Sequence, residues 1–263
     1  MTGLDPTNPQ RPIAVVTQEQ LNALHAALTG PIEQRMPLDE AAKTGLAELG
    51  ILDSLGLTPN ARPIFEALES AEHRVCSVLV NPSAPEQVTN LRMWLSPTST
   101  TVERTDHDGI HLYAVDAPEV GHVLVSNTNL QPTALVSDGP PWIPASALEA
   151  LRTGDVATSA KVLADTGSQG PDDSLVGQAM RDGSWSLSLI FREELTEDGW
   201  GLSHHITLLR TPAMLYQVEA PAFGIGEGGV PVDGECALVP LPGTQAWALV
   251  AGLLQLEAAT EGL

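Results

Sequence analysis

The chain has 263 residues, 43% of them hydrophobic, which is enough to bury the core of one large domain or of two closely packed halves. Its 33 acidic residues outnumber 12 basic ones and give a net charge of −21, which argues against nucleic acid and anionic membranes as partners. The two cysteines, Cys76 and Cys236, are far apart in the sequence and do not make a disulfide framework, so both are expected as buried thiols.

The two ends of the chain predict no membrane or export segment. Residues 1–12 are polar and proline-rich, which is typical of a flexible tail and not of a secretory signal. The longest apolar stretch lies within Ala246–Leu256 and is too short to span a bilayer. We therefore expect a cytoplasmic protein with no membrane insertion.

The first part of the chain predicts helices followed by strands. Thr17 and Gln20 fit a capping box, and Val16 with Leu21 fits a hydrophobic staple, so a helix is expected from Thr17 to Gly30. Further helices are predicted over 38–49 and 59–70, the second with Pro59 in its first turn. The periodicity then falls to two, which predicts strands near 73–80, 88–95, 99–105, 109–115 and 120–126. Thr105–Gly109 reads as a hairpin turn because it contains Asp108-Gly109.

The second part of the chain predicts the same kinds of element after a connection at 127–143. Helices are expected from 144 or 146 to 152, and over 156–165 and 171–182. Strands are expected near 184–193, 201–210, 213–219 and 234–240, with a hairpin turn at Glu197–Gly199. A last helix starts near Pro242, with a buried face formed by Ala246, Leu249, Val250, Leu253 and Leu254.

The two parts resemble each other in the order of their elements. Pro59 and Pro171, Ala67 and Ala179, and Val78 and Ile190 are each 112 residues apart. The repeat indicates two similar halves that share one pseudo-symmetric sheet. Because the strands outnumber those of alternating βαβ units and form local hairpins, the sequence favours an α+β fold with an antiparallel sheet.

Motifs for catalysis or cofactor binding are not found. Glycines 224, 226, 228 and 229 do not fit a phosphate loop, because no helix is expected after them. His204 and His205 are adjacent on a strand and point to opposite faces, so they do not readily chelate one metal. His107 and His111 beside Asp106 and Asp108 could form a weak metal site, but acidic turn residues explain the aspartates equally well. We expect no catalytic residue, no cofactor and no metal.

The five tryptophans fall into two classes. Trp94, Trp185 and Trp247 lie in regular elements and are expected in the core. Trp142 lies in the connection between the halves and Trp200 lies beside the turn at Asp198-Gly199. An exposed indole in a loop favours partner binding because it buries a large area at low entropic cost. Packing beneath a loop is the alternative for both.

Several segments together resemble the EspG family, the cytosolic chaperones of actinobacterial ESX (type VII) secretion. In the first half they are Leu46-Ala47-Glu48-Leu49-Gly50-Ile51-Leu52-Asp53, Leu57-Thr58-Pro59 and Ile64-Phe65-Glu66-Ala67-Leu68. In the second half they are Ala147-Leu148, Ala160-x-x-Leu163, the helix at 171–180, the strands at 184–210 and Val239-Pro240-Leu241-Pro242. The resemblance runs from Thr17 to Leu256.

The resemblance implies a fold and a function. The fold is a single domain over residues 13–256, with a central antiparallel sheet, quasi-two-fold repeated halves (about 13–126 and 144–256) and two flanking helical bundles. The function is that of a non-enzymatic chaperone. It binds the hydrophobic tip of a PPE protein in a PE–PPE heterodimer, keeps it soluble and targets it for secretion.

The family has no short residue signature, so the partner-binding residues are a hypothesis. We expect the hairpin loop at Thr105–Gly109 and the segment from Trp200 to His205 to face the partner. The residues concerned are Asp106, His107, Asp108, Trp200, His204 and His205.

Two other functions stay open. The first is a hydrolase-like enzyme with a histidine and carboxylate pocket between the halves, for which His204 and His205 are the candidates. The second is a symmetric dimerisation module. For the leading hypothesis we expect a monomer or a weak homodimer.

Overall fold

The computed structural model describes most of the chain, namely residues 14–29, 35–54, 56–59, 61–83, 89–97, 99–106, 109–128, 130, 142–152, 155–169, 174–219 and 234–254. The side chains of Asp106, Leu151 and Arg152 are not among the described parts.

The chain divides into two compact units. Unit 1 comprises Met1–Cys76, Asn90–Leu124 and Arg192–Ser203, and unit 2 comprises Ser77–Thr89, Val125–Phe191 and His204–Leu263.

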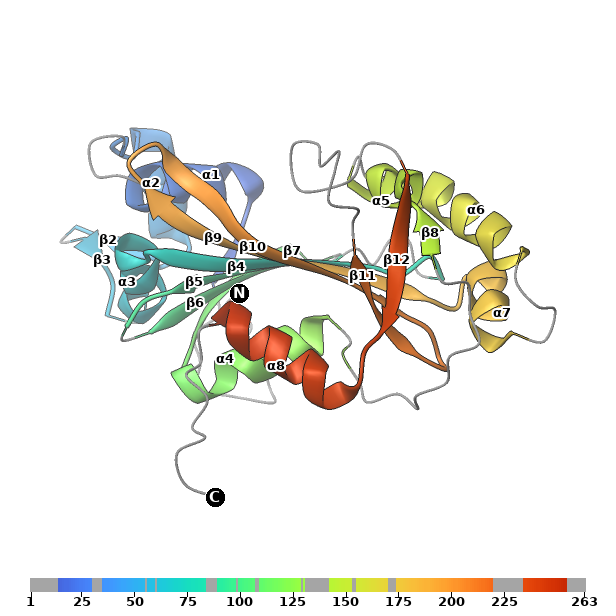
Figure 1. Cartoon of the computed structure of the whole chain (residues 1–263). Coiled ribbons are helices and arrows are strands. Elements are labelled where there is room, and N and C mark those ends of the chain that lie inside the picture. Colours follow the sequence, from blue (N-terminus) through green and yellow to red (C-terminus); the bar gives the residue numbers. More distant parts are fainter. Residues whose placement is uncertain are drawn as a thin grey trace, which may run out of the picture. The chain divides into compact units, whose positions relative to one another are not determined.

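Unit 1 contains a sheet whose strands follow the order β1-β7-β6-β5-β4 and continue with parts of β9 and β10 (Figure 1). The strands are β1 (Ala14–Val16), β4 (His73–Val80), β5 (Thr89–Leu95), β6 (Thr100–Asp106), β7 (Gly109–Val115), β9 (Ser186–Thr196) and β10 (Gly199–Arg210). The pairs β1–β7, β6–β7 and β5–β6 are antiparallel. The β6–β7 hairpin closes between Asp106 and Gly109, and Gly109 has φ 129, so the turn predicted at this glycine is confirmed.

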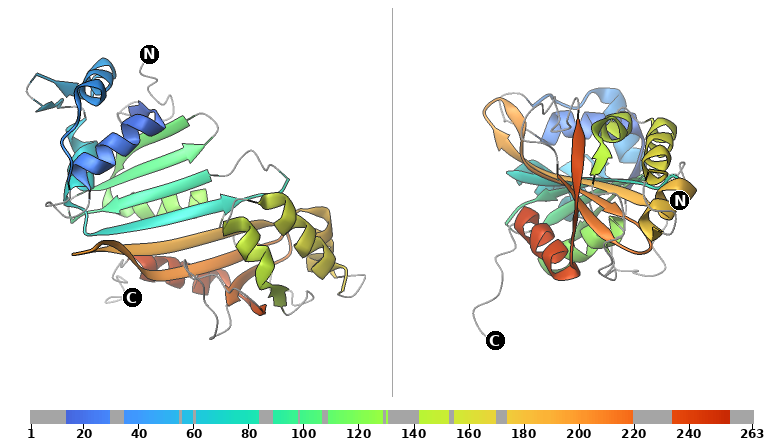
Figure 2. Two further views of the ribbon diagram at one scale, coloured as in Figure 1. Left: turned by 90° about the horizontal axis from the view of Figure 1, so that it is seen from above. Right: turned by 45° about the vertical axis from the view of Figure 1, so that its right-hand side comes forward.

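Unit 1 also contains helices, the first three of which contribute residues to its buried core. They are α1 (Gln18–Leu28), α2 (Glu40–Glu48), α3 (Arg62–Ser70) and α4 (Ala117–Asn127), with a small hairpin of β2 (Leu52–Asp53) and β3 (Gly56–Leu57) after α2. The capping box at α1 is confirmed, because the Gln20 N–H donates to Thr17 Oγ1 and the Thr17 N–H donates to Gln20 Oε1. Figure 2 shows α1 lying over the strands of unit 1, where Leu21 and Leu24 join the same buried cluster as Trp94.

Unit 2 contains a sheet in the order β4-β9-β10-β11-β12-β8, with helices of its own. The further elements are β8 (Trp142–Pro144), α5 (Ala145–Arg152), α6 (Val156–Gly167), α7 (Leu175–Asp182), β11 (Leu215–Glu219), β12 (Glu235–Pro240) and α8 (Gly243–Leu254). Residues of α5, α6 and α7 pack in one buried cluster with Trp185, which directly precedes β9, and with strand residues such as Leu187 and Tyr216.

Helices α6 and α7 approach closely because two glycines face each other. A Cβ on Gly167 would lie 2.6 Å from the carbonyl oxygen of Gly177 and 2.8 Å from Met180 Cβ. A Cβ on Gly177 would lie 2.9 Å from the carbonyl oxygen of Gly167. Arg181 Nη1 donates to the Gly167 oxygen at 2.7 Å and so satisfies the C-terminal end of α6. The contact between these helices depends on glycine at both positions.

Replacing Gly167 by alanine is expected to lower the free energy of unfolding by about 1–3 kcal/mol, since overpacking displaces backbone here and not a flexible side-chain end. Gly252→Ala in α8 is the matched control, because nothing lies within 4 Å of its Cβ position. That variant should be neutral or more stable by up to about 1 kcal/mol. Urea denaturation followed by circular dichroism measures both, and equal effects of the two substitutions would contradict the close contact.

The order of elements repeats along the chain. Apart from the small β2–β3 hairpin of the first half, each half has, within the described residues, a short strand, three helices, four strands and a helix. In each half the short strand pairs with the last strand, β1 with β7 and β8 with β12. The predicted α+β fold with a large antiparallel sheet is confirmed. The two compact units do not coincide with the two halves, because β4, β9 and β10 each contribute residues to both units. The division into one domain with halves at 13–126 and 144–256 stays a prediction.

Three sequence expectations about elements are wrong. The strand predicted at 120–126 is the helix α4, because Pro118 and Glu119 in its first turn are helix-start signals and Val120, Gly121 and Leu124 are buried with helical spacing. Helix α3 begins at Arg62, with Pro63 in its first turn, so Pro59 precedes the helix. Helix α7 begins at Leu175 after the capping residue Ser174, whose hydroxyl accepts from the Gly177 N–H.

Candidate functional site

The predicted partner-binding residues occupy different environments. Trp200 lies in β10 within unit 1 and is half-buried; its ring packs edge-on against Trp94 at a centroid distance of 5.3 Å. Arg74 lies over the Trp200 ring, with its guanidinium carbon 4.6 Å from the centroid. The sequence left open whether Trp200 is exposed for partner binding or packed beneath a loop, and in the structure it is packed.

The two adjacent histidines are exposed. His204 and His205 lie in the part of β10 that belongs to unit 2. Successive side chains of a strand point to opposite faces, and both of these are exposed to solvent. Asp106 ends β6, and its side chain is not described. His107 and Asp108 lie outside the described residues.

Unit 1 contains a cluster of charged and aromatic side chains, which we call the Trp94 cluster. Its members are His25, Arg74, Arg92, Trp94, Glu103, Glu193 and Trp200. Trp94 is fully buried, with the His25 ring centroid at 5.1 Å and the guanidinium carbons of Arg74 and Arg92 at 5.0 and 5.7 Å from its ring centroid. Cations over an indole face are attracted by its quadrupole.

Glu103 is the acidic centre of this cluster. Its Oε1 and Oε2 accept from Arg92 Nη1 at 3.1 and 3.2 Å, and His25 Nε2 lies 2.9 Å from Oε2. Burial alone would raise the pKa of Glu103, but the close approach of His25 and the charge of Arg92 together lower it. The paired register of β5 and β6 places Arg92 directly opposite Glu103, so neighbouring strands supply both charges.

A second ion pair connects β4 with β9 in unit 1. Arg74 Nε donates to Glu193 Oε2 at 2.5 Å, and Cys76 Sγ lies 3.5 Å from the same oxygen. Burial raises the pKa of the Cys76 thiol to about 12, so this cysteine is an unreactive neutral thiol at physiological pH. The charges of the Trp94 cluster are paired inside unit 1, and the arrangement holds the sheet under α1.

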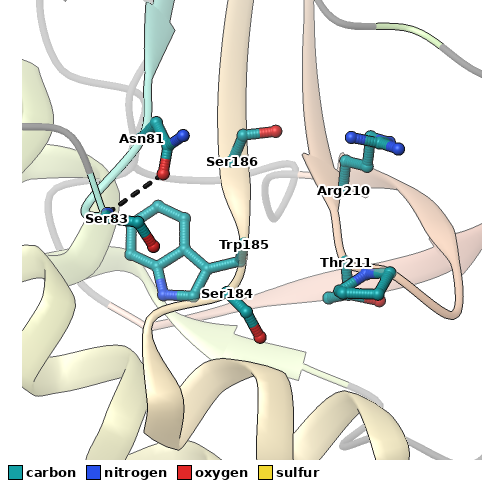
Figure 3. Close-up of a pocket in the computed structure, with 8 residues that line it drawn as sticks. Asn81, Ser83, Ser184, Trp185, Ser186, Arg210 and Thr211 are labelled. Carbon is teal, nitrogen blue, oxygen red and sulfur yellow. Dashed lines mark hydrogen bonds between the residues drawn. The ribbon is translucent and has the colours of Figure 1, made fainter. Parts of the chain in front are cut away.

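Unit 2 has a polar pocket at the ends of three neighbouring strands (Figure 3). Its volume is about 200 Å³. The lining residues are Asn81, Ser83, Ser184, Trp185, Ser186, Arg210, Thr211 and Pro212. None of these residues was predicted from the sequence as a site residue, since no local motif brings the three strand ends together.

Unit 2 also has an apolar groove, which we call the Trp247 groove. It has a volume of about 190 Å³ and is lined by Val125, Leu130, Leu215, Gly243, Ala246, Trp247 and Val250. Trp247 is 51% exposed, so its predicted place in the core is wrong. It follows Ala246 by one residue and is therefore turned by about 100° from it around α8. Ala246, Val250, Leu253 and Leu254 are buried as predicted, whereas Leu249 of the same predicted face is half-buried. Trp247 stands at the edge of that face. Trp94 and Trp185 are buried as predicted.

Neither pocket has a histidine or a carboxylate in its lining. Among the described residues, no group of three or more histidine, cysteine, aspartate or glutamate side chains is placed to hold a metal ion. Within the same residues, no helix is both long and apolar enough to cross a bilayer.

Comparisons with known proteins find similarity among solved structures. No protein-family model matches the chain, and no curated protein matches it either. Among solved structures, the chain is similar to the Mycobacterium tuberculosis type VII secretion system chaperone EspG5, determined in complex with a PE25–PPE41 dimer. The alignment has 14% sequence identity and a TM-score of 0.49, and it covers 92% of this chain and 96% of that one. It transfers no residue role to this chain.

Proposed function

We propose that the chain is a non-enzymatic cytosolic chaperone of ESX (type VII) secretion. It binds the hydrophobic tip of a PPE protein in a PE–PPE heterodimer, keeps that tip soluble and targets the pair for secretion. The partner class comes from the resemblance of the sequence segments to the EspG family. The observation that carries the proposal is the Trp247 groove, an exposed apolar surface with an indole at its rim.

The groove has the chemistry that recognition of an apolar tip requires. Leu215, Ala246 and Val250 are buried residues that form its apolar lining, while half of the Trp247 side chain is exposed to solvent. An exposed aromatic residue beside an apolar pocket is the usual composition of a binding hot spot, because it buries a large area with few rotatable bonds. The size of the groove suits one or two apolar side chains of a partner.

The residues predicted from the sequence remain proposed contacts. His204 and His205 are exposed, which supports a role in partner binding. In this proposal Asp106, His107 and Asp108 contact the partner through the hairpin loop between β6 and β7. Trp200 is half-buried against Trp94, which supports an indirect role: it holds β10 in place.

Replacing Trp247 by alanine is expected to weaken binding of a PE–PPE pair by at least about tenfold, because the variant removes the rim of the groove. The full chain is co-expressed with PE–PPE pairs from the same genome, the complex is isolated by gel filtration, and its Kd is measured by calorimetry. Leu175→Ala is the matched control, since Leu175 is also 51% exposed in unit 2 and lies on α7, outside the groove lining. The control is expected to bind like the wild type.

Two outcomes would count against different parts of the proposal. If the wild-type chain forms no complex with any PE–PPE pair of its genome, the chaperone function is wrong. If a complex forms and Trp247→Ala leaves its Kd unchanged, the function stands and the groove is not the contact surface.

A further inference from the structure

The polar pocket of unit 2 collects hydrogen-bond donors from three neighbouring strands. Asn81 directly follows β4, Ser186 begins β9, and Arg210 ends β10. Hydrogen bonding places β9 between β4 and β10. In Figure 3 Asn81, Ser186 and Arg210 stand in a row across these strands, with Ser186 in the middle.

The Asn81 amide is held in a defined orientation. The Ser83 N–H donates to Asn81 Oδ1 at 3.0 Å. With the oxygen turned toward Ser83, the amide nitrogen Nδ2 is on the other side and points toward Ser186, as Figure 3 shows. The amide group therefore offers N–H donors, and not its oxygen, to the space beside Ser186.

The neighbouring loops are held by hydrogen bonds of their own. Ser83 Oγ donates to the Gly183 carbonyl oxygen at 2.8 Å and links the loop after β4 to the end of α7. The Met214 N–H donates to Thr211 Oγ1 at 3.1 Å, which closes the turn after β10. Trp185 is 2% exposed and forms a rigid wall. A pocket whose donors are fixed before binding loses little conformational entropy when a ligand enters.

The local charge of the pocket differs from that of the chain. Arg210 brings a guanidinium group, and none of the eight lining residues is acidic. The whole chain has 33 acidic residues against 12 basic ones. A guanidinium next to hydroxyl and amide donors matches the oxygens of a carboxylate or phosphate, which arginine binds through two parallel N–H donors.

We propose that this pocket is a binding site for an oxyanion, the carboxylate or phosphate group of a small ligand, held by Arg210, Ser186 and Asn81 Nδ2. Arg210 supplies the charge, and Ser186 and Asn81 supply neutral donors from the two neighbouring strands. The pocket has a volume of about 200 Å³, whereas one water molecule in the liquid occupies roughly 30 Å³. The pocket can therefore hold the anionic group and part of the molecule that carries it. This site is separate from the Trp247 groove in its residues and in its chemistry.

The test is a titration of the full chain followed by NMR. Sodium phosphate and sodium acetate are added in separate experiments against sodium chloride at constant ionic strength, and the signals of the Asn81 side-chain amide and Arg210 Nε–H are followed. Saturable shifts with phosphate assign the site to phosphate groups, and saturable shifts with acetate assign it to carboxylates. Shifts that do not saturate with either anion would overturn the proposal.

Two variants and a control make the test specific. Arg210→Met is expected to weaken anion binding at least about tenfold, because it removes a charge-assisted contact. Asn81→Asp keeps an oxygen for the Ser83 N–H and puts a negative charge where Nδ2 stood, so binding should fall by at least as much. Arg62→Met removes the same charge from an exposed side chain of α3 in unit 1 and should bind like the wild type.

The Asn81→Asp variant also protects the test from a folding artefact. If Arg210→Met loses the dispersed spectrum of the folded chain, the decision rests on Asn81→Asp, whose side chain has the same size. Wild-type affinity in a folded Asn81→Asp variant would overturn the assignment of the pocket as an oxyanion site.

Discussion

Replacing Trp94 by alanine is expected to lower the free energy of unfolding by about 3–5 kcal/mol, the cost of removing a fully buried aromatic side chain. Trp94 is the centre around which His25, Trp200 and two arginines pack. The variant leaves a cavity that these side chains cannot all fill, because Arg74 and Arg92 are held by ion pairs to Glu193 and Glu103. It also removes the indole face beneath two cations.

Trp247→Ala provides the matched control for this prediction. The same atoms are removed, but the side chain is 51% exposed, so the free energy of unfolding should change by no more than about 1 kcal/mol. Guanidinium chloride denaturation followed by far-UV circular dichroism measures both variants without depending on tryptophan emission. Similar losses in the two variants would show that Trp94 is not the packing centre of unit 1.

Local sequence signals account for most of the fold. The capping box at Thr17 and Gln20, the hairpin turn at Gly109 and the apolar face of α8 were all predicted from short-range patterns, and all are present. The repeated order of helices and strands follows from the same patterns, because each half carries the same local signals. Such features depend on neighbours within a few residues, so the sequence alone is enough to predict them.

The errors arise where long-range pairing decides the structure. The short strands β1 and β8 have three residues each and exist because they pair with β7 and β12, far away in the sequence. Trp142 was expected in a connecting loop, but it pairs with Ala237 in β12. In α4 the run Val123-Leu124-Val125 favours a strand by composition, and the helix signals at Pro118 and Glu119 determine the outcome.

The functional sites were the least predictable part. Arg92 and Glu103 were not distinguished from other charged strand residues, because their contact depends on the register between β5 and β6. The polar pocket needs the ends of β4, β9 and β10 to lie together, which no motif announces. Trp247 differs from a core residue only by its position around α8, and a shift of one residue along the helix decides between burial and exposure.

Glu103→Gln is expected to lower the free energy of unfolding at pH 7 by about 2–3 kcal/mol, because hydrogen bonds to a charged partner in a buried site are lost. Only 8% of the Glu103 side chain is exposed, and the carboxylate is the counterion of Arg92. Glutamine keeps the shape and one acceptor oxygen, so the packing around Trp94 is preserved. The burial of the guanidinium lowers the pKa of Arg92, and the charge of Glu103 raises it, so the substitution removes a group that stabilises the charged arginine.

The same substitution is expected to reduce the loss of stability in acid. Because the pKa of Glu103 is lower in the folded chain than its ordinary value of 4.5, the unfolded chain binds the proton more readily. Stability from this group is therefore complete above the ordinary value and is lost as the pH falls through the lowered folded value. The difference in unfolding free energy between wild type and Glu103→Gln should be constant from pH 7 to about 5 and should shrink below about 4.5.

Glu69→Gln separates this local effect from the repulsion among the chain's many carboxylates. Glu69 lies 3.8 Å from Arg35, as Glu103 lies beside Arg92, but 60% of its side chain is exposed. Both variants remove one negative charge from a chain of net charge −21, so any relief of general repulsion is common to the two. The Glu69 variant should change stability by less than about 1 kcal/mol at pH 7, because exposed ion pairs contribute little. A wild-type minus Glu103→Gln difference that stayed constant down to pH 3 would mean that the pKa of this carboxyl is not lowered by folding, and that Arg92 and His25 do not act on it as the geometry requires.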